Sequence, residues 1–468
     1  MLRKNDEIIC TVNSTGNNGE GVVKLDSYVI FVPFSLPKEK IKCKILKVDK
    51  NIAFGKLLEV LEPSKDRIVP KCPVFGKCGG CQLQHINYES QIKLKEQTIK
   101  DAFSKIAFLN VDVKNCVFDD RQYRYRNKLQ LPVRQLNDKN VIGFYSEGTH
   151  RVIPIDDCLI NPCWTSIIIN CLNNYMQAYS LKGYNEFNNS GNIREITVRE
   201  VNDSLIITLV VLKNNLPNLD YFINQLKQLL PNKFSLYINV NKAQTNVVYG
   251  DDFYLAYGDA NYQSQMLGIN FQMGVRSFMQ VNSNMCEKLY SYVVSNIPVN
   301  QNAVVIDAYS GAGLMTALLS KNAKKAIGIE IIPEAVEMAN QLAIDNNLQN
   351  KITNYLGKCE EILPSVVEQE SKNSNVYVVL DPPRKGCDIK VINALLKSNV
   401  STIVYVSCKP QTLARDVGLL CGSLQEIDGK IVKSLSNEGI YDLISLTPFD
   451  LFAQTKHVET VAVLTRKK

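Results

Sequence analysis

The stretch Val304-Val-Ile-Asp307-Ala-Tyr309-Ser-Gly311-Ala-Gly313 predicts a buried strand that runs into a glycine turn and then into a helix. Glu330 ends the next apolar strand, nineteen residues after Gly311. An acidic residue at about that distance is placed to bind the ribose hydroxyls of a nucleoside-type cofactor. The third glycine of a dinucleotide fingerprint is absent, since Leu314-Met-Thr follows. The sequence therefore predicts a nucleoside site at the edge of a parallel sheet.

Strands and helices alternate from about residue 300, which is typical of βαβ units and a parallel sheet. An acidic residue before the glycines, Asp307, resembles the S-adenosylmethionine site of class I methyltransferases more than an NAD site. We therefore expect a Rossmann-like α/β domain over residues 276–468. Its expected strands are Ala303–Asp307, Ala326–Ile332, Val376–Asp381 and Thr402–Ser407. A helix is expected to begin at Pro333-Glu334, with one face formed by Ala335, Met338, Ala339 and Leu342.

Two further domains are expected before this one. Residues 1–60 predict a small five-stranded barrel, OB-like in type, with a basic stripe, because Lys40-Ile-Lys-Cys-Lys-Ile45 alternates strictly between lysines and apolar residues. Residues 61–275 predict a strand-rich central domain that contains a hairpin, Ile193–Val201 with Leu205–Leu212, and a helical segment at 82–107.

Composition limits the class of protein. The 468 residues are 45% hydrophobic and 21% charged, which is ordinary for a soluble globular chain. No run of about 18 apolar residues occurs, and the first residues lack the apolar core of a signal peptide. We expect a cytoplasmic protein, without a membrane partner and monomeric, whose fourteen cysteines are thiols, metal ligands or catalytic groups.

The net charge of +7 is unevenly distributed. Residues 1–60 hold 10 Lys and Arg against 7 Asp and Glu, and residues 61–151 hold 16 against 10. The remaining residues hold 27 against 29. This asymmetry suggests a front end that binds a polyanion, joined to a separate catalytic body. The segment Arg121-Gln-Tyr-Arg-Tyr-Arg-Asn-Lys128 interleaves cations with aromatic rings and is expected to contact RNA, as a strand with its tyrosines on one face.

Three cysteines form the pattern Cys72-x5-Cys78-Gly-Gly-Cys81. Glycines at these positions let the backbone fold tightly around a bulky inorganic group, and three thiolates leave a fourth ligand to come from elsewhere. We expect a [4Fe-4S] cluster. Zinc is the alternative, although zinc more often uses paired Cys-x2–4-Cys knuckles. Both Cys158 and Cys163 are candidates for the fourth ligand.

Two strand ends carry reactive groups. Asp381-Pro-Pro-Arg384 follows one apolar strand and Ser407-Cys408-Lys409 follows the next, so both should meet at the carboxyl edge of the sheet. Asp-Pro-Pro followed by an aromatic residue would suggest methylation of an exocyclic amine, but Arg384 occupies that position. A thiolate suits a different reaction. Its addition to carbon 6 of uracil makes carbon 5 nucleophilic, and a base must later remove the carbon 5 proton.

Several motifs together resemble the bacterial RNA uracil-C5 methyltransferases. They are the cysteine pattern, Phe278-Met-Gln280-Val-Asn282, Asp381-Pro-Pro-Arg-Lys-Gly386, Ser407-Cys-Lys-Pro-Gln-Thr-Leu-Ala-Arg-Asp416 and His457-Val-Glu459-Thr. In the barrel, Gly19-Glu-Gly-Val, Val29-Ile-Phe-Val-Pro33 and Leu36-Pro-Lys-Glu39 resemble the TRAM domain, an RNA-binding module.

This resemblance implies roles for residues of this chain. Cys408 would be the nucleophile and Glu459 the base, although His457 is an alternative base from the residues alone. Gln280, Tyr309, Glu330 and Asp381 would line the pocket for S-adenosylmethionine and uracil. Cys158 is selected as the fourth cluster ligand, with Cys72, Cys78 and Cys81.

The resemblance also suggests a substrate. The TRAM domain and the cysteines resemble the branch that modifies 23S rRNA, and a transfer-RNA target is the alternative. A protein of another class, a redox-sensing RNA-binding protein with an inactive methyltransferase fold, would lack methyl transfer altogether.

Overall fold

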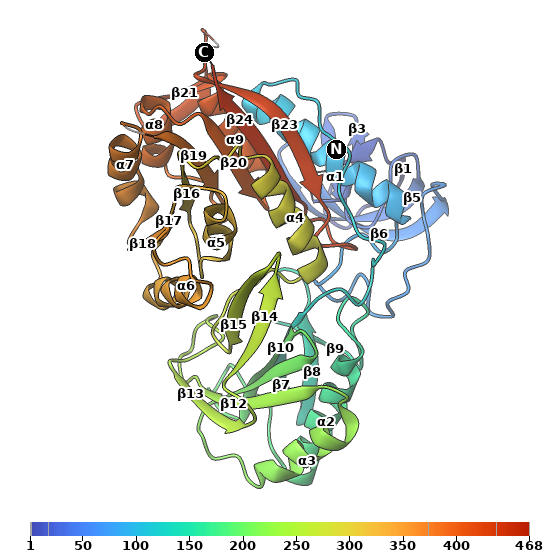
Figure 1. Cartoon of the computed structure of the whole chain (residues 1–468). Coiled ribbons are helices and arrows are strands. Elements are labelled where there is room, and N and C mark those ends of the chain that lie inside the picture. The colour runs from blue at the N-terminus through green and yellow to red at the C-terminus, as the bar shows by residue number, and fades with distance from the viewer. Residues whose placement is uncertain (1, 17, 373, 437, 468) are drawn as a thin grey trace.

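The structure, a computed structural model, describes residues 2–16, 18–372, 374–436 and 438–467 and shows three domains. The N-terminal sheet and the C-terminal α/β domain lie together at one end of the molecule, and the central domain forms the other end (Figure 1). Within the described ranges, no helix has both the length and the apolar character needed to span a membrane.

The N-terminal domain is a six-stranded sheet in the order β1-β5-β6-β4-β3-β2. Ile41, Cys43 and Ile45 are fully buried in its core, which confirms the alternation read from the sequence. One strand more than predicted is present, because β2 adds a two-residue pairing. The strands are β1 (Glu7–Thr11), β2 (Ser14–Thr15), β3 (Gly21–Leu25), β4 (Tyr28–Val32), β5 (Lys40–Asp49) and β6 (Ile52–Glu62).

The central domain has a seven-stranded sheet in the order β13-β12-β11-β10-β7-β8-β9, and α2 (Trp164–Ala178) and α3 (Leu219–Leu229) pack on one face. The predicted hairpin is formed by β10 and β11, which pair antiparallel around Asn202. The strands are β7 (Lys128–Leu136), β8 (Lys139–Tyr145), β9 (Val152–Pro154), β10 (Ile193–Val201), β11 (Ser204–Val211), β12 (Lys233–Val240) and β13 (Asp252–Tyr257).

A second hairpin connects the central and C-terminal domains. Its strands are β14 (Asn261–Met266) and β15 (Ile269–Gly274). Apolar side chains of β14 and β15 share one buried cluster with residues of the central sheet and of α5 (Leu314–Ser320). The hairpin therefore holds the central domain against the helices that border the glycine turn.

The C-terminal sheet has the order β18-β17-β16-β19-β20-β24-β23. Its first five strands are parallel, and β24 runs antiparallel between β20 and β23. The four predicted strands are present, each with ends within two residues of those expected. The strands are β16 (Ala303–Ala308), β17 (Lys325–Glu330), β18 (Ile352–Leu356), β19 (Asn375–Leu380), β20 (Thr402–Ser407), β23 (Tyr441–Phe449) and β24 (Glu459–Arg466); β21 (Leu424–Ile427) and β22 (Lys430–Lys433) form a separate hairpin.

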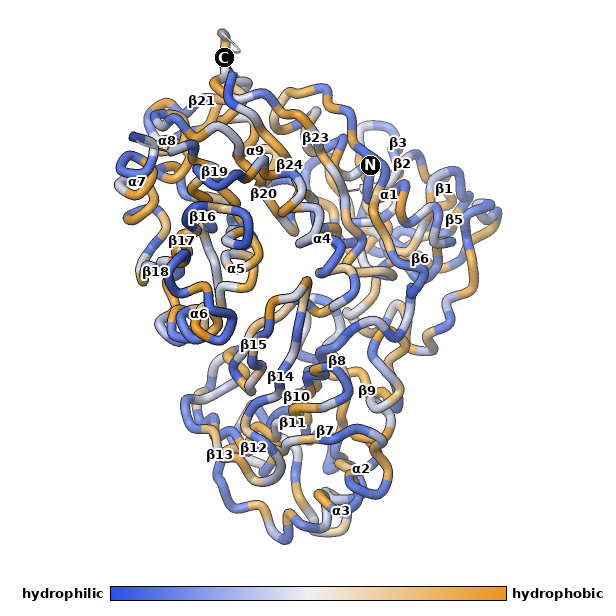
Figure 2. Tube along the Cα trace, in the orientation of Figure 1, coloured by the Kyte–Doolittle hydropathy of each residue, from blue (hydrophilic) through white to orange (hydrophobic). Residues whose placement is uncertain are grey.

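Helices cover both faces of this sheet, whose strands are largely apolar (Figure 2). One face is covered by α7 (Cys359–Glu370), α8 (Ile389–Lys397) and α9 (Pro410–Leu420), and the other by α4 (Ser283–Ser295) and α5. The helix α6 (Pro333–Asp345) begins at the expected proline, but its buried face is centred on Val336, Ala339 and Leu342. Met338, which the periodicity placed on this face, instead lines a cavity.

The helix α1 (Tyr88–Ala102), followed by a π-helical turn at Phe103–Ala107, lies on the C-terminal domain. Ile99 and Phe103 are fully buried in the core that α9 and the C-terminal sheet share. This segment falls inside the range 61–275 that we assigned to the central domain. Burial of its apolar side chains against the α/β core explains why it packs there.

Candidate active site

One large cavity, of about 1180 Å³, opens at the carboxyl edge of the parallel strands. Its walls contain all six residues that the sequence predicted for the cofactor, the nucleophile and the base. They are Gln280, Tyr309, Glu330, Asp381, Cys408 and Glu459. Open α/β sheets bind their ligands at this edge, and the volume is sufficient for a cofactor together with a nucleotide.

The glycine turn after β16 forms one wall of this active-site cavity. The amide N–H groups of Tyr309 and Ser310 both donate to the carbonyl of Ile329, which brings the turn close to β17. Gly313 has a φ of +82°, and a Cβ there would lie 2.7 Å from Cβ of Ala339 on α6. Only glycine fits this close approach. Tyr309 itself has a φ of +70°, a strained backbone conformation that is concentrated at functional sites.

Glu330 is held in place by backbone donors. Its Oε2 accepts a hydrogen bond from the N–H of Gly311 at 2.9 Å, and its Oε1 accepts from Ile331 and Ile332 at 2.8 and 2.9 Å. A carboxylate has about four acceptor positions, so three amides leave one free for a ribose hydroxyl. The glycine turn and Glu330 therefore fit a nucleoside cofactor.

Gln280 belongs to the loop between β15 and α4, and Asn127 holds this loop. The side chain of Asn127 donates to the carbonyl of Gln280 at 3.0 Å and to the hydroxyl of Ser283 at 2.8 Å. Its backbone N–H donates to the carbonyl of Val281. Asn127 immediately precedes β7, so the central domain positions this part of the cofactor wall. The sequence did not predict this role for Asn127, because its partners lie about 150 residues away.

Cys408 and Glu459 come from neighbouring strands at the same edge. Cys408 follows β20, while Glu459 begins the antiparallel strand β24. Ser407 of β20 pairs with Thr460 of β24, so Cys408 and Glu459 occupy the next pair of positions. Glu459 is buried, with an exposed fraction of 4%. Burial, and then the neighbouring charge of Asp381, raises the pKa of Glu459 to about 8, against the opposing effect of Arg384.

Arg384 lies beside both reactive groups. Burial raises the pKa of Cys408, and the charge of Glu459 raises it further, whereas Arg384 lowers it by its charge and by a hydrogen bond. In the sequence, Arg384 was notable only as the residue that replaces an aromatic side chain. The structure shows it to be a cation that favours the ionised form of both Cys408 and Glu459.

Two further acids lie on the sheet side of the site. Desolvation raises the pKa of Asp381 to about 7, and burial raises that of Asp307 to about 7 although Thr316 donates a hydrogen bond to it at 2.6 Å. Both residues also line an adjoining cavity of about 420 Å³ that reaches between α5, α6 and the β14–β15 hairpin. Three carboxyl groups with raised pKa values, those of Asp307, Asp381 and Glu459, therefore line the active-site cavity or the cavity that adjoins it.

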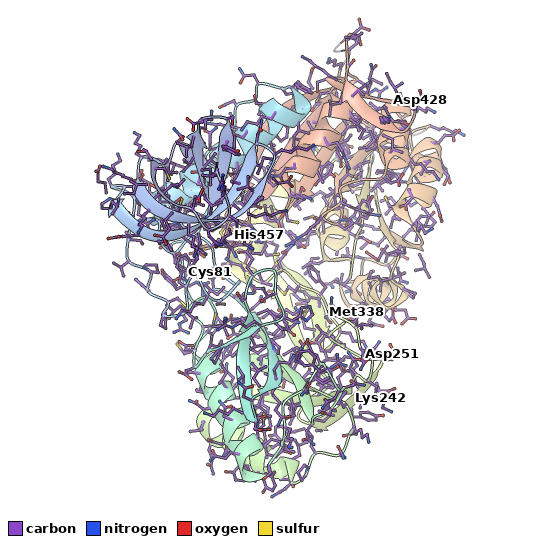
Figure 3. The ribbon with its side chains drawn as sticks, turned by 180° about the vertical axis from the view of Figure 1, so that it is seen from behind. Cys81, Lys242, Asp251, Met338, Asp428 and His457 are labelled. Carbon is purple, nitrogen blue, oxygen red and sulfur yellow. The ribbon has the colours of Figure 1, made fainter. Side chains whose placement is uncertain are left out.

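His457 lies on the wall of the active-site cavity, two residues before Glu459. Burial, followed by the charge of Arg384, lowers the pKa of His457 to about 4. The imidazole is therefore neutral near pH 7 and a much weaker base than Glu459. Figure 3 labels His457 and Cys81 near the place where the three domains meet.

The predicted cluster cysteines lie on another cavity. Cys72, Cys78, Cys81 and Cys158 all line a space of about 640 Å³, whereas Cys163 is exposed at the start of α2. Burial raises the pKa of Cys81 to about 12 and that of Cys158 to about 11, so a metal centre would have to supply the charge that deprotonates them.

The spacing of these thiols bears on the kind of centre. Within the described ranges, no three His, Cys, Asp or Glu side chains are close enough together to hold one metal ion. A zinc ion with Zn–S bonds of about 2.3 Å needs sulfurs roughly 4 Å apart. A four-iron cluster binds each cysteine through a different iron and needs no such closeness. The four cysteines thus line one cavity, but they do not form a metal site among the described residues.

The segment Arg121–Lys128 is irregular up to β7, not a strand as predicted. Arg124 has a φ of +55° and forms an ion pair with Asp157 at 2.6 Å, next to Cys158. Tyr125 is buried and donates to the carbonyl of Ala453 at 3.0 Å. These two side chains are structural, and Arg126 remains on the cavity wall.

The parallel sheet with one antiparallel strand, and the cavity at its carboxyl edge, are the arrangement of a methyltransferase fold. The chain belongs to the tRNA (Uracil-5-)-methyltransferase family, which matches residues 87–467, and residues 4–58 match the TRAM domain. It is therefore an S-adenosylmethionine-dependent enzyme of an RNA uracil-5-methyltransferase family, as the sequence motifs indicated.

Relatives and a solved structure agree with this assignment. Uncharacterised RNA methyltransferases of Clostridium acetobutylicum and Clostridium tetani are 35% and 36% identical over 471 and 466 residues, covering 99% of this chain and 98% and 97% of theirs. The fold is similar to that of the Pyrococcus abyssi tRNA (uracil-54, C5)-methyltransferase in complex with S-adenosyl-L-homocysteine, with a TM-score of 0.75 and 24% identity. That likeness covers 98% of this chain and 100% of the other.

Proposed function

We propose that this protein methylates carbon 5 of a specific uridine in RNA, with Cys408 as nucleophile and Glu459 as base. The observation that supports this most directly is the placement of Cys408, directly after β20, next to Glu459, the first residue of β24, on the cavity that the predicted cofactor-binding residues also line. S-adenosylmethionine, when bound, supplies an electrophilic methyl group.

In the proposed reaction, Cys408 activates the uracil ring and Glu459 removes the proton that methylation leaves on carbon 5. The Cys408 thiolate forms a bond to carbon 6 of the uracil ring, and the electron pair of the 5,6 double bond moves toward carbon 5 and the carbonyl at position 4. Carbon 5 then takes the methyl group, and S-adenosylhomocysteine leaves. The Glu459 carboxylate removes the proton from carbon 5, the carbon 6–sulfur bond breaks, and the thiolate is restored. The acquired proton passes from Glu459 to solvent.

Glu459 is the stronger candidate for the base. An efficient general base has a pKa near the working pH, and the pKa of Glu459 is raised to about 8. The pKa of His457 is lowered to about 4, so it would hold an abstracted proton poorly. Arg384 favours the thiolate and the carboxylate together, which is the protonation state that the reaction needs.

A covalent trap tests this assignment. With S-adenosylmethionine present, Glu459→Gln should accumulate a protein–RNA adduct on denaturing gels, because the final elimination is blocked. Cys408→Ala should form no adduct and transfer no radiolabelled methyl group. Turnover by Cys408→Ala would overturn the mechanism, and wild-type protein without any methyl transfer would favour an inactive RNA-binding protein.

The proposed substrate is 23S rRNA in the cytoplasm. The TRAM domain and the four cysteines support this proposal, because together they resemble the branch of RNA uracil-C5 methyltransferases that modifies 23S rRNA. The Pyrococcus abyssi neighbour acts on transfer RNA, so transfer RNA is the alternative outcome. Mass mapping of both RNA classes from cells without this protein would decide, since only the true substrate loses its 5-methyluridine.

The four cysteines are proposed to hold a [4Fe-4S] cluster, which would tie the loop at Cys72–Cys81 to Cys158. Iron and sulfide analysis of protein purified without oxygen tests this, and zinc without sulfide would refute it. Cys158→Ser should lose iron. Cys163→Ser is the matched control, since Cys163 is exposed and lies off the cavity, and it should retain the full iron content.

A further inference from the structure

We infer that Arg126, Lys128 and Arg199 form a binding site for one phosphodiester of the RNA backbone, next to the nucleotide that enters the active-site cavity. This inference rests on the proposed function for the identity of the polyanion. In the sequence, Arg126 and Lys128 are only part of one basic segment, and nothing local distinguishes Arg199.

The three cations come together because two strands pair. Lys128 begins β7 and lies directly opposite Arg199 of β10 in the antiparallel register. Residues paired in this way point to the same face of the sheet, with their Cβ atoms about 5 Å apart. Arg126 lies two residues before Lys128. Like charges at directly opposed positions are unfavourable, so this arrangement needs a separate explanation.

In the described part of the chain, no carboxylate forms an ion pair with these three cations. Among the ion pairs between described residues, none includes Arg126, Lys128 or Arg199. Glu195 lies on the same strand as Arg199, but its carboxylate accepts a hydrogen bond from Gln130 at 3.1 Å. A group of mutually repelling cations in a folded protein indicates that an anion from outside completes the site.

Arg199 provides the second observation. Its side chain is only 9% exposed, and its Nη1 is buried without a hydrogen-bond partner in the described structure. Burial lowers the pKa of Arg199, and it also lowers that of Lys128, on which Arg199 and Arg126 act in the same direction. Buried polar groups are nearly always paired, so an unpaired guanidinium N–H beside a half-buried lysine fits a ligand that is absent from the protein itself.

The position of the site suggests which phosphate binds there. Arg126 lines both the active-site cavity and the cysteine cavity, and Lys128 lines the cysteine cavity. Asn127, between them, holds the loop that carries Gln280. A nucleotide whose base reaches Cys408 has left the base stack. Its phosphate backbone must then be bound at the opening of the active-site cavity. Arg126 and Lys128 would contact that phosphate. Arg199, opposite Lys128, would not contact it but would add positive charge next to it.

Binding of a labelled 12-nucleotide oligouridine at several salt concentrations tests the inference, with Cys408→Ala as the parent so that no adduct forms. Each single-strand phosphate contact contributes about −0.7 to the slope of log K against log salt. Lys128→Gln should weaken binding on the order of tenfold and flatten the slope by about that amount. Arg199→Gln removes a charge behind that contact, so it should flatten the slope in the same direction but by less. An oligouridine with uncharged methylphosphonate linkages should abolish the difference between parent and variants.

Arg194→Gln is the matched control. Arg194 is an equally buried arginine on the same strand, but its Nη1 donates to the carbonyls of Asn241 and Ala243, both at 2.7 Å. This variant should lower the melting temperature and leave the salt slope unchanged. Arg199→Gln should instead keep or raise the melting temperature of the RNA-free protein, because it removes an unpaired buried charge.

Opposite results would overturn the inference. A lower melting temperature with an unchanged salt slope in Arg199→Gln would show that Arg199 is structural. A binding loss that persists with uncharged linkages would show that the cations contact bases. The binding experiment does not depend on methyl transfer. If the methylation assay failed, a smaller salt slope in the variants would therefore still support the phosphate site.

Discussion

Lys95 of α1 donates a hydrogen bond from its Nζ to Oδ1 of Asp450 at 2.5 Å, and both side chains are almost completely buried. The hydroxyl of Tyr88 donates to the other carboxylate oxygen at 2.7 Å, and Lys95 also donates to the carbonyl of Phe452. Asp450 and Phe452 belong to the segment between β23 and β24. An ion pair between residues 355 positions apart therefore fixes the chain that ends at Glu459.

Breaking this pair should destabilise the protein strongly. Lys95→Met leaves the Asp450 carboxylate buried without its cation, which costs about 3–5 kcal/mol of the free energy of unfolding. Urea denaturation measures the loss. Lys93→Met is the control, because Lys93 pairs on the same helix with the exposed Glu89 and should leave the stability unchanged. A loss as small as that of the control would show that the buried pair does not hold the segment.

The two glycines of the cofactor turn should respond differently to alanine. Gly311 has a φ of +54°, and a Cβ added there would meet no atom within 4 Å, so Gly311→Ala costs only the left-handed strain of about 1–2 kcal/mol. Gly313→Ala adds a contact of 2.7 Å with Cβ of Ala339, and overpacking of this kind costs roughly 1–3 kcal/mol more. Equal losses in denaturant titrations would contradict the close packing of α6 on the turn.

Local pattern predicted the α/β domain well. Thr402–Ser407 coincides with β20, and the acidic residue after the glycine turn, Glu330, accepts a hydrogen bond from Gly311 of that turn. Consecutive apolar residues are a strong signal when a strand is buried on both faces. Four of the predicted residues on the active-site cavity, Tyr309, Glu330, Asp381 and Cys408, lie at or just after the carboxyl ends of parallel strands, which meet at one edge of the sheet. Gln280 and Glu459 were predicted only from the family resemblance.

Long-range contacts were not readable from the sequence. Tyr125 and Arg124 looked like alternating strand residues, but their partners, Ala453 and Asp157, lie 328 and 33 positions away and pull the backbone out of a strand. Glu459 reads as an ordinary exposed glutamate. Its burial to 4% follows from β24 lying between β20 and β23, and no local periodicity specifies that order.

Glu459 should make stability depend on pH. Its pKa is raised from an unfolded value of 4.5 to about 8, so the folded state binds a proton more tightly than the unfolded state. This contribution to stability is complete below about pH 4.5 and is lost as the pH rises through 8. Glu459→Gln should therefore melt at a higher temperature than wild type at about pH 8.5, with the difference shrinking toward about pH 4.5.

Glu368→Gln, at an exposed position of α7, provides the comparison for that experiment. This substitution removes an exposed carboxyl group, so the variant should have the same melting temperature as wild type at every pH. If Glu459→Gln follows wild type in the same way over this pH range, the carboxyl group of Glu459 is not desolvated by the strands around it.

Arg384 should set the pH at which the reaction runs. Its charge lowers the pKa of Cys408 and that of Glu459, and both groups must be ionised for addition and elimination. In Arg384→Gln, the rate of methyl transfer should therefore begin to rise at a higher pH than in wild type. Arg384→Lys keeps the charge and should shift this pH less. Single-turnover methyl transfer between about pH 6 and 9 measures this rising limb of the pH–rate profile.

Lys385 separates this effect from a general loss of positive charge. It lies next to Arg384 and lines the same cavity, but it is not among the charges that act on Cys408 or Glu459. Lys385→Gln should leave the limb in place even if RNA binds more weakly. Because Arg384 is exposed, added salt should screen its effect and move the wild-type limb toward that of Arg384→Gln. A lower rate at every pH with an unmoved limb would assign Arg384 to RNA contact instead.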